Sequence, residues 1–299
     1  MINFWDWPEE RAATYREPYA WIRERVYPER MEKSKEKSYR NIMSMWWQHW
    51  NVRPGLYHAI GRGHHFERHP EGWSPTKNQL PRVLAITRVS KTLAFSFVDS
   101  NIVFSDATVA FSRARGRNFA LLQSNVHAVF AWQYTSRLKS DLRYSPTDAL
   151  EPFAFPDEFD ATSNDMLDEL GDRLHQARIE VMRSDRIGLT HLYNRFHDLE
   201  NRDPRIETLR TLQVEMDAAV ARAYGWEDLD LEHEFHEVPY LPENDRVRFT
   251  ISEAARIEVL RRLAELNRQR YEEEVARGLH GGTVNECRMA RGRRGRKRK

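Results

Sequence analysis

The stretch Arg82-Val-Leu-Ala-Ile-Thr-Arg88 decides the fold class of this chain. It is short, apolar and rich in branched side chains, a composition that is typical of a β-strand. Three further stretches of the same kind follow at Thr92–Val98, Asn101–Phe104 and Thr108–Phe111. Together they predict a small β-sheet in this part of the chain.

One helix and one more strand are predicted to complete this unit. Apolar residues between Phe119 and Phe130 recur at spacings of three and four, which predicts a single amphipathic helix. The segment Ser136–Arg143 then alternates polar and apolar side chains, as a strand does. An apolar segment punctuated by prolines, from Asp148 to Pro156, closes the unit.

Both flanks are predicted to be helical. Residues 8–60 carry an aromatic stripe, and after residue 163 we expect helices at Met166–Ser184, Pro204–Tyr224 and Ile251–Arg277. Thr250 with Glu253 forms a capping-box pattern, and Gly278 suits the left-handed position after a last helical turn. We therefore predict an α+β fold, with a mixed small β-sheet domain between N-terminal helices and a C-terminal helical domain. The expected units are a helical linker at 1–44, the sheet domain at 45–158, the helical domain at 159–284 and a disordered basic tail at 285–299.

The composition excludes several classes of protein. The 299 residues are 40% hydrophobic and 31% charged, which is typical of a globular protein of two packed units or one extended domain. No apolar run approaches the roughly 20 residues needed to cross a bilayer, so we expect a cytoplasmic location and no membrane partner. The single cysteine, Cys287, provides neither a disulfide nor a thiolate zinc site within one chain.

The positive charges are concentrated rather than evenly spread. The chain has 47 Lys and Arg against 45 Asp and Glu, and a net charge of +2 by itself indicates nothing about nucleic acid. Basic residues outnumber acidic ones between Arg82 and Arg143, and again from Arg291 to Lys299. Any contact with phosphate is therefore expected in the middle of the chain and in the tail.

The sequence lacks the motifs of DNA methylation and cleavage. There is no Asn/Asp-Pro-Pro-Tyr/Phe run to hold an exocyclic amine, and no Asp/Glu-x-Lys to hold a metal ion. Gly61-Arg62-Gly63 follows no strand, so we interpret it as a loop and not as a nucleotide site. Catalysis by this chain alone is unsupported.

Two groups of residues that contain histidine are candidate sites. His58, His64, His65 and His69 crowd one segment, but with no Cys partner we favour a surface or phosphate-facing loop over a metal site. Ser124 and His127 share a helix face, yet an orienting acid is lacking, so ordinary packing is the better interpretation.

A row of polar side chains is the strongest candidate. On a strand, residues two apart point the same way, so Lys139, Asp141 and Arg143 would face away from Leu138 and Leu142. Lys can donate to guanine O6 and N7, and Asp can accept from cytosine N4, so the pair could read one G·C pair. The alternative is a solvated strand face.

The sequence resembles the recognition region of MmeI-like and PglX-like DNA adenine methyltransferases. The resemblance keeps one order from Trp46 to His280. It rests on Trp46-Trp47-Gln48, Arg53-Pro54, Pro81–Lys91, Leu121-Leu-Gln-Ser-Asn-Val-His127, Leu138–Pro146, Gly188–Asp198, Met216-Asp217, Ala223-Tyr-Gly-Trp226 and the segment from Arg248 to His280.

The resemblance implies a domain that reads an asymmetric site in double-stranded DNA. It implies base-reading roles for Lys139, Asp141 and Arg143, and for Ala107 on an earlier strand. The matching Arg-x-Ser-Lys run implies contacts of Arg88, Ser90 and Lys91 with the DNA backbone, which set register without reading sequence. The alternative for that run is a plain turn between two strands.

The chain departs from the family because nothing before Met1 supplies the catalytic motifs. We therefore expect no cofactor in this chain, with S-adenosylmethionine bound by a partner methyltransferase polypeptide or a missing N-terminal domain. The chain would be half of a split enzyme, a truncated product or a standalone specificity subunit, and not an enzyme by itself. One alternative is an interaction subunit of a phage-defence complex, which docks through Trp5, Trp7, Trp21, Trp46 and Trp47; another is an enzyme of unknown chemistry.

Overall fold

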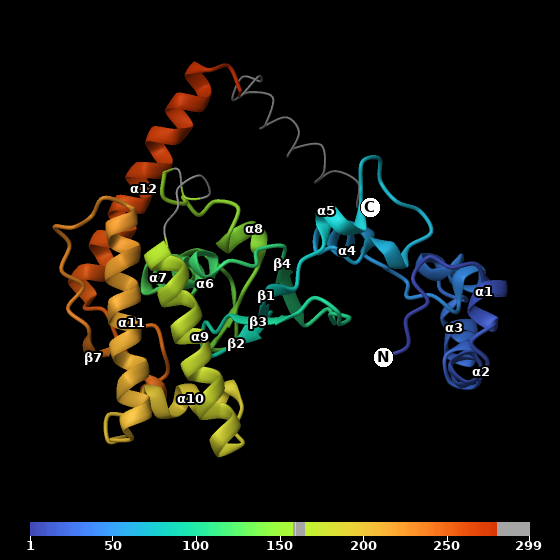
Figure 1. The fold of residues 1–299 in the computed structure, drawn as a ribbon, viewed down its shortest axis with the longest axis horizontal. Helices are drawn as coiled ribbons and strands as arrows, with labels where there is room; N and C mark the ends of the chain where they lie inside the picture. Colours follow the sequence, from blue (N-terminus) through green and yellow to red (C-terminus); the bar gives the residue numbers. More distant parts are fainter. Residues whose placement is uncertain (158, 160–164, 280–299) are drawn as a thin grey trace.

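Two small antiparallel sheets lie at the centre of the molecule (Figure 1). The computed structural model describes residues 1–157, 159 and 165–279. The first sheet has the order β3-β1-β4, with β1 at Arg82–Thr87, β3 at Ser96–Asp99 and β4 at Thr108–Phe111. The second has the order β2-β6-β5, with β2 at Val89–Ser90, β5 at Arg137–Leu138 and β6 at Asp141–Arg143.

Helices precede and follow the two sheets along the chain, so the predicted α+β class is confirmed. Figure 1 shows the N-terminal helices at one end and the long C-terminal helices at the other. The N-terminal elements are α1 at Glu9–Ala13, α2 at Arg16–Arg25, α3 at Tyr27–Lys33, η1 at Lys37–Tyr39, η2 at Ile42–Met45, α4 at Pro54–Ala59, η3 at Gly63–His65 and α5 at Pro75–Asn78. The later elements are α6 at Gly116–Gln123, α7 at Asn125–Tyr134, α8 at Pro146–Ala149, α9 at Asp165–Asp185, α10 at Leu189–Phe196, α11 at Pro204–Ala223, β7 at Glu234–Glu237, η4 at Glu243–Asp245, β8 at Val247–Thr250 and α12 at Glu253–Ala276.

Two of the predicted strands of the first sheet differ in the structure. Thr92–Val98 becomes a strand only from Ser96, because the side chain of Gln123 takes the place of a neighbouring strand at the preceding residues. The Phe95 N–H donates to Gln123 Oε1 at 2.9 Å, and Gln123 Nε2 donates to the Leu93 carbonyl at 3.1 Å.

The segment Asn101–Phe104 is not a strand. Its backbone is bonded to side chains: the Asn101 N–H donates to Asp99, and the Phe104 N–H donates to the Tyr57 hydroxyl at 3.2 Å. Arg62 Nη1 donates to the Ile102 carbonyl. Because Tyr57 and Arg62 belong to the N-terminal part of the chain, these bonds tie that part to the sheet.

The predicted helix Phe119–Phe130 is two helices. Ser124 separates α6 from α7 with extended backbone, ψ 157°, and its hydroxyl accepts the His127 N–H at 3.3 Å as the N-cap of α7. The break turns the chain and exposes the backbone N–H of Asn125 to a partner on α11.

Glycine allows α6 and α9 to cross at close range. A Cβ on Gly116 would lie 2.0 Å from the Asp168 carbonyl oxygen, and one on Gly171 would lie 2.1 Å from the Gly116 carbonyl oxygen. Real side chains do not approach backbone this closely. The two glycines therefore place the C-terminal helices directly against the sheet domain.

The C-terminal helices follow the predicted ranges within a few residues. Gly278 has the expected left-handed φ, 74°, after α12, and Gly225 has a φ of 73° after α11. The predicted capping box is wrong: the N-cap of α12 is Ser252, whose hydroxyl accepts the Ala255 N–H at 3.1 Å. Thr250 lies on β8 and bonds to Asn125 instead.

The buried apolar side chains form two clusters. The first runs from Phe4 to Val83, and the second runs from Leu84 to Leu263. Val83 and Leu84 are adjacent on β1 but belong to different clusters, so β1 connects the two clusters. The predicted unit boundaries remain predictions, and the tail at 285–299 lies outside the described residues. No helix in the described ranges is both long and apolar enough to pass through a membrane.

Candidate functional site

Lys139 lies in a hairpin turn and not on a strand. β5 and β6 pair with Leu138 opposite Asp141, so Lys139 and Ser140 form a two-residue turn. Lys139 has a left-handed φ of 57°. The prediction of one strand over Ser136–Arg143 is therefore wrong, and Lys139 does not continue a row with Asp141. Asn-Gly is the usual signal for such a turn, and Lys-Ser gives none.

The hairpin presents Asp141 and Arg143 on one face. Because side chains alternate along β6, these two residues point away from Leu142, which is 2% exposed and packs in the core. Leu138 pairs with Asp141 across the hairpin, so it shares the polar face. Leu138 is 55% exposed and does not bury beside Leu142 as expected.

Arg88 joins the two sheets. Its backbone N–H donates to the Ala107 carbonyl at 2.7 Å, and its own carbonyl accepts the Tyr144 N–H at 2.8 Å. Since β2 pairs Val89 with Arg143, the predicted residues Arg88, Ala107 and Arg143 lie together. Ala107 is exposed in the turn that precedes β4, which corrects its expected place on a strand.

Ser90 and Lys91 lead from this region toward the C-terminal part. Ser90 pairs with Leu142, and its hydroxyl accepts the Thr92 N–H at 3.2 Å, which closes a turn after β2. Lys91 Nζ lies 3.8 Å from Asp245 Oδ2, and the Lys91 side chain is largely exposed. The structure thus brings Arg88 and Ser90 to the hairpin and places Lys91 further away.

Positive charge dominates this surface. Residues 88–91 and 137–143 contain five cations and one acid. Within the part of the chain that the structure describes, no ion pair involves Lys139, Asp141 or Arg143. These three side chains are therefore available to a partner. The cations are Arg88, Lys91, Arg137, Lys139 and Arg143.

Arg137 is a cation of the hairpin that the sequence reasoning missed, and its pairing with Leu142 puts it on the face opposite to Asp141 and Arg143. Its Nη1 donates to the Tyr240 carbonyl at 3.2 Å, and its guanidinium carbon lies 5.3 Å from the centre of the Tyr240 ring. Arg137 therefore anchors the hairpin to the segment between β7 and β8. The partner is 103 residues away in sequence, so no local pattern indicates the contact.

A buried polar network holds the sheet domain against the helices. The Asn125 N–H and Nδ2 donate to the two oxygens of Asp217 at 2.9 and 2.7 Å. Gln213 Nε2 donates to Asp217 at 3.1 Å, and His233 Nε2 lies 2.8 Å from it. The Thr250 hydroxyl donates to Asn125 Oδ1 at 2.9 Å. The fully buried Asp217 carboxylate is therefore surrounded by three residues, Asn125, Gln213 and His233, and Thr250 holds Asn125 in place.

In the candidate histidine segment His64 and His69 are exposed, whereas His58 and His65 are half-buried and Gly61 and Gly63 are buried. The rings of His65 and Trp5 stack at 4.9 Å, and those of His69 and Trp73 stack at 4.6 Å. Burial lowers the pKa of His65 to about 4. A Cβ at Gly61 would lie 2.3 Å from the Asn78 carbonyl oxygen, so the chain itself fills the space beside the Gly-Arg-Gly run.

Ser124 and His127 have no catalytic arrangement. Ser124 is the cap of α7, and His127 Nε2 bonds to the Tyr144 hydroxyl at 3.0 Å. Burial lowers the pKa of His127 to about 3, so its ring is neutral near pH 7. The pair supports the strand that carries Arg143, because Tyr144 follows Arg143 directly.

Residues 53–157 match a family model described as the target recognition domain of MmeI. This range contains both central sheets and the hairpin, so this part of the chain is an MmeI-like target recognition region. A solved structure of the Type IIL restriction-modification enzyme MmeI in complex with DNA has the same fold, with a TM-score of 0.50 and 18% sequence identity. The match covers 83% of this chain and 26% of that one, so this chain spans about a quarter of the enzyme's length. A comparison with curated proteins found no match.

Proposed function

We propose that this chain recognises a specific sequence in double-stranded DNA. It would be the recognition portion of a site-specific DNA adenine methyltransferase in a restriction-modification or phage-defence system. One observation carries the proposal: the hairpin of a target-recognition fold presents Lys139, Asp141 and Arg143 without internal ion pairs among the described residues. The segments 88–91 and 137–143 hold five cations and one acid, a balance that favours a polyanionic partner.

The hairpin is a two-stranded ribbon, a kind of element that can enter the major groove. The major groove of B-DNA, about 12 Å wide, admits a two-stranded ribbon. At its tip Lys139 would donate to guanine O6 or N7, and Asp141 would accept from cytosine N4. Arg143 would contact a second guanine on the same face. Leu138 provides an apolar contact for a thymine methyl group.

The residues at the junction of the sheets would set the register of the hairpin. Arg88 precedes β2 and Ser90 ends it, and β2 pairs with β6, so the backbone at both residues is fixed relative to Arg143. We assign them, with Lys91, to the DNA backbone. Ala107 lies beside Arg88 through the backbone hydrogen bond, and its small side chain would allow a base edge to approach.

Methyl transfer would be performed by a methyltransferase domain, either on a partner polypeptide or on a longer form of this protein. These 299 residues span about a quarter of the similar enzyme, and they carry no Asn-Pro-Pro-Tyr run. We therefore propose that such a domain binds S-adenosylmethionine and flips the target adenine out of the duplex. The recognition chain would determine which adenine is presented.

Filter binding of the purified chain at two salt concentrations tests DNA binding, and selection from a random duplex pool tests base reading. We expect affinity with a steep salt slope and one enriched sequence. The double variant Lys139→Ala with Asp141→Ala should change the preferred base at one position and keep most nonspecific affinity. The double variant Lys35→Ala with Glu32→Ala removes an exposed pair at the C-terminal end of α3 and serves as the charge-matched control.

Two results would reject the proposal. An absence of DNA affinity at low salt would favour the alternative of an interaction subunit. Enrichment of an unchanged site by the hairpin variant would remove base reading from Lys139 and Asp141. The alternative is weaker in the structure, because Trp5, Trp7 and Trp46 fill the N-terminal core and only Trp21 among the expected docking residues is half exposed.

A further inference from the structure

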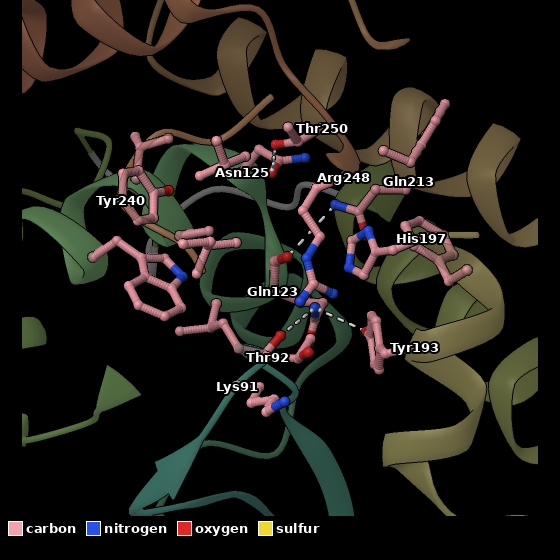
Figure 2. Close-up of a pocket in the computed structure, with 18 residues that line it drawn as sticks. Lys91, Thr92, Gln123, Asn125, Tyr193, His197, Gln213, Tyr240, Arg248 and Thr250 are labelled. Carbon is pink, nitrogen blue, oxygen red and sulfur yellow. Dashed lines mark hydrogen bonds between the residues drawn. The ribbon is translucent and has the colours of Figure 1, made fainter. Parts of the chain in front are cut away.

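A cavity of about 90 Å³ lies between the recognition sheets and the C-terminal helices. Its walls come from the residues after β2, from the α6–α7 junction, from α10 and α11, and from the β7–β8 segment. Figure 2 shows Lys91 at one side of it and Arg248, His197 and Tyr193 around its interior. A space of this size holds several water molecules or a small ion.

The lining of the cavity is positively charged. Lys91 and Arg248 line it, and none of the described residues that line it is Asp or Glu. The nearest carboxylates lie behind the lining. Asp245 pairs with Arg248 at 2.5 Å and with Lys91 at 3.8 Å, and Asp217 is occupied by Asn125, Gln213 and His233. The lining itself therefore attracts an anion.

Several hydrogen-bond donors have capacity left for such an anion. Arg248 uses Nε and Nη2 on Asp245, and for Nη1 no partner is found within the described ranges. The Tyr193 hydroxyl accepts from Gln123 Nε2 at 3.1 Å and from Arg178 Nη1 at 2.8 Å, so its own proton remains to be donated. These groups point into the same space.

His197 is the clearest sign of an incomplete site. Its Nδ1 is buried, and among the described residues it has no hydrogen-bond partner. A buried polar atom without a partner destabilises the folded state. A ligand in the cavity that carries an oxygen would satisfy it.

We propose that this cavity binds a small oxyanion, of the size of phosphate, between Arg248, Lys91, Tyr193 and His197. Arg and Lys together with a phenolic hydroxyl are the donors that bind tetrahedral oxyanions in proteins. The apolar walls would also accept the small body of an acid that carries such a group. The proposal does not rest on base reading, because Lys139, Asp141 and Arg143 do not line the cavity, and Lys91 alone of its four residues is also assigned to the DNA backbone.

Isothermal titration of the full chain with inorganic phosphate, at ionic strength held constant with sodium chloride, tests the proposal. We expect saturable binding of one ion and a rise of the melting temperature. Two variants should each weaken binding at least tenfold: Arg248→Met removes a donor, and Ala128→Leu fills the cavity while it keeps every charge. Arg143→Met removes a cation at the hairpin and is the matched control, with unchanged affinity for phosphate.

The arms of the experiment distinguish a free ion from a DNA phosphate. A short DNA duplex should not displace phosphate from the cavity. Displacement by the duplex would place the ion at the DNA surface and overturn the proposal. Loss of phosphate binding in Arg143→Met, with binding retained in Arg248→Met and Ala128→Leu, would do the same. No saturable binding to the unmodified chain would overturn it as well. Crystals soaked in selenate, a heavier analogue of a tetrahedral oxyanion, locate the site without any variant. The proposal requires the anomalous signal of selenium to lie between Arg248 and Lys91.

Discussion

The backbone nitrogen of Arg88 lies 2.7 Å from the carbonyl oxygen of Ala107, and this hydrogen bond joins two segments that are 19 positions apart in sequence. It continues the pairing of β1 with β4 by one residue, while the Arg88 carbonyl starts the pairing with β6 through Tyr144. One residue therefore belongs to both sheets, and its side chain and its backbone have separable tasks.

Replacing Arg88 in two ways separates those tasks. Arg88→Ala keeps the backbone bond and should lower DNA affinity evenly across sequences, with a salt slope smaller by about 1. Arg88→Pro removes the N–H and should destabilise the protein by about 1–3 kcal/mol. Urea unfolding and filter binding measure the two effects. Equal loss of stability in both variants would show that the bond is not structural.

The left-handed conformation of Lys139 predicts an unusual response to glycine. A non-glycine residue with this backbone conformation costs roughly 1–2 kcal/mol, and glycine adopts it freely. Lys139→Gly should therefore raise the free energy of unfolding by up to about 1 kcal/mol although it weakens base reading. Lys139→Val should lower it. Urea unfolding of both variants decides, and a destabilised glycine variant would contradict the turn.

The crossing of α6 and α9 should tolerate no side chain at Gly171. A methyl group there would meet the Gly116 carbonyl at 2.1 Å, and both neighbours are backbone that cannot rotate away. We expect Gly171→Ala to cost about 1–3 kcal/mol or more. Gly188→Ala is the matched control, because a Cβ there has nothing within 4 Å. Similar melting temperatures for the two variants would refute the close crossing.

Burial of His127 predicts a dependence of stability on pH. Its pKa falls from 6.5 in the unfolded chain to about 3 in the folded one, so only the unfolded state binds this proton in between. Stability is thus greatest above pH 6.5 and decreases as the pH falls toward 3, by up to about 1.4 kcal/mol per pH unit from this residue. In His127→Gln the slope between pH 6.5 and 5 should be smaller. An unchanged slope would mean that His127 is not buried as described.

The sequence predicted the elements whose signals are local. The strand Arg82–Thr87 and the helix ends at Gly225 and Gly278 follow from branched residues and from glycine after a last turn. The irregular segments follow from distant partners. Gln123 replaces a strand beside Phe95, and Tyr57 bonds the backbone at Phe104, so alternation of apolar residues gave the wrong element there.

The candidate site shows the same division. Period-two alternation places Asp141 and Arg143 on one face, as the structure has them. It could not locate the turn at Lys139, because Lys-Ser lacks the usual turn residues, and it therefore put Leu138 on the wrong side. Arg137 was missed because its partner, Tyr240, lies on a segment that no pattern connects to the hairpin.

The carboxylate of Asp217 has a consequence for anyone who wishes to build chimeras with new specificities. Transplanting residues 53–157 alone would carry Asn125 into a foreign scaffold without its acceptor, Asp217. In the protein that receives a foreign segment in exchange, Asp217 would keep His233 but lose the two hydrogen bonds from Asn125. The segment that can be exchanged between proteins is therefore either shorter or longer than residues 53–157. Exchanging only the exposed tip around Lys139 and Asp141, or moving the segment together with α9–α11 and β8, would keep the graft folded.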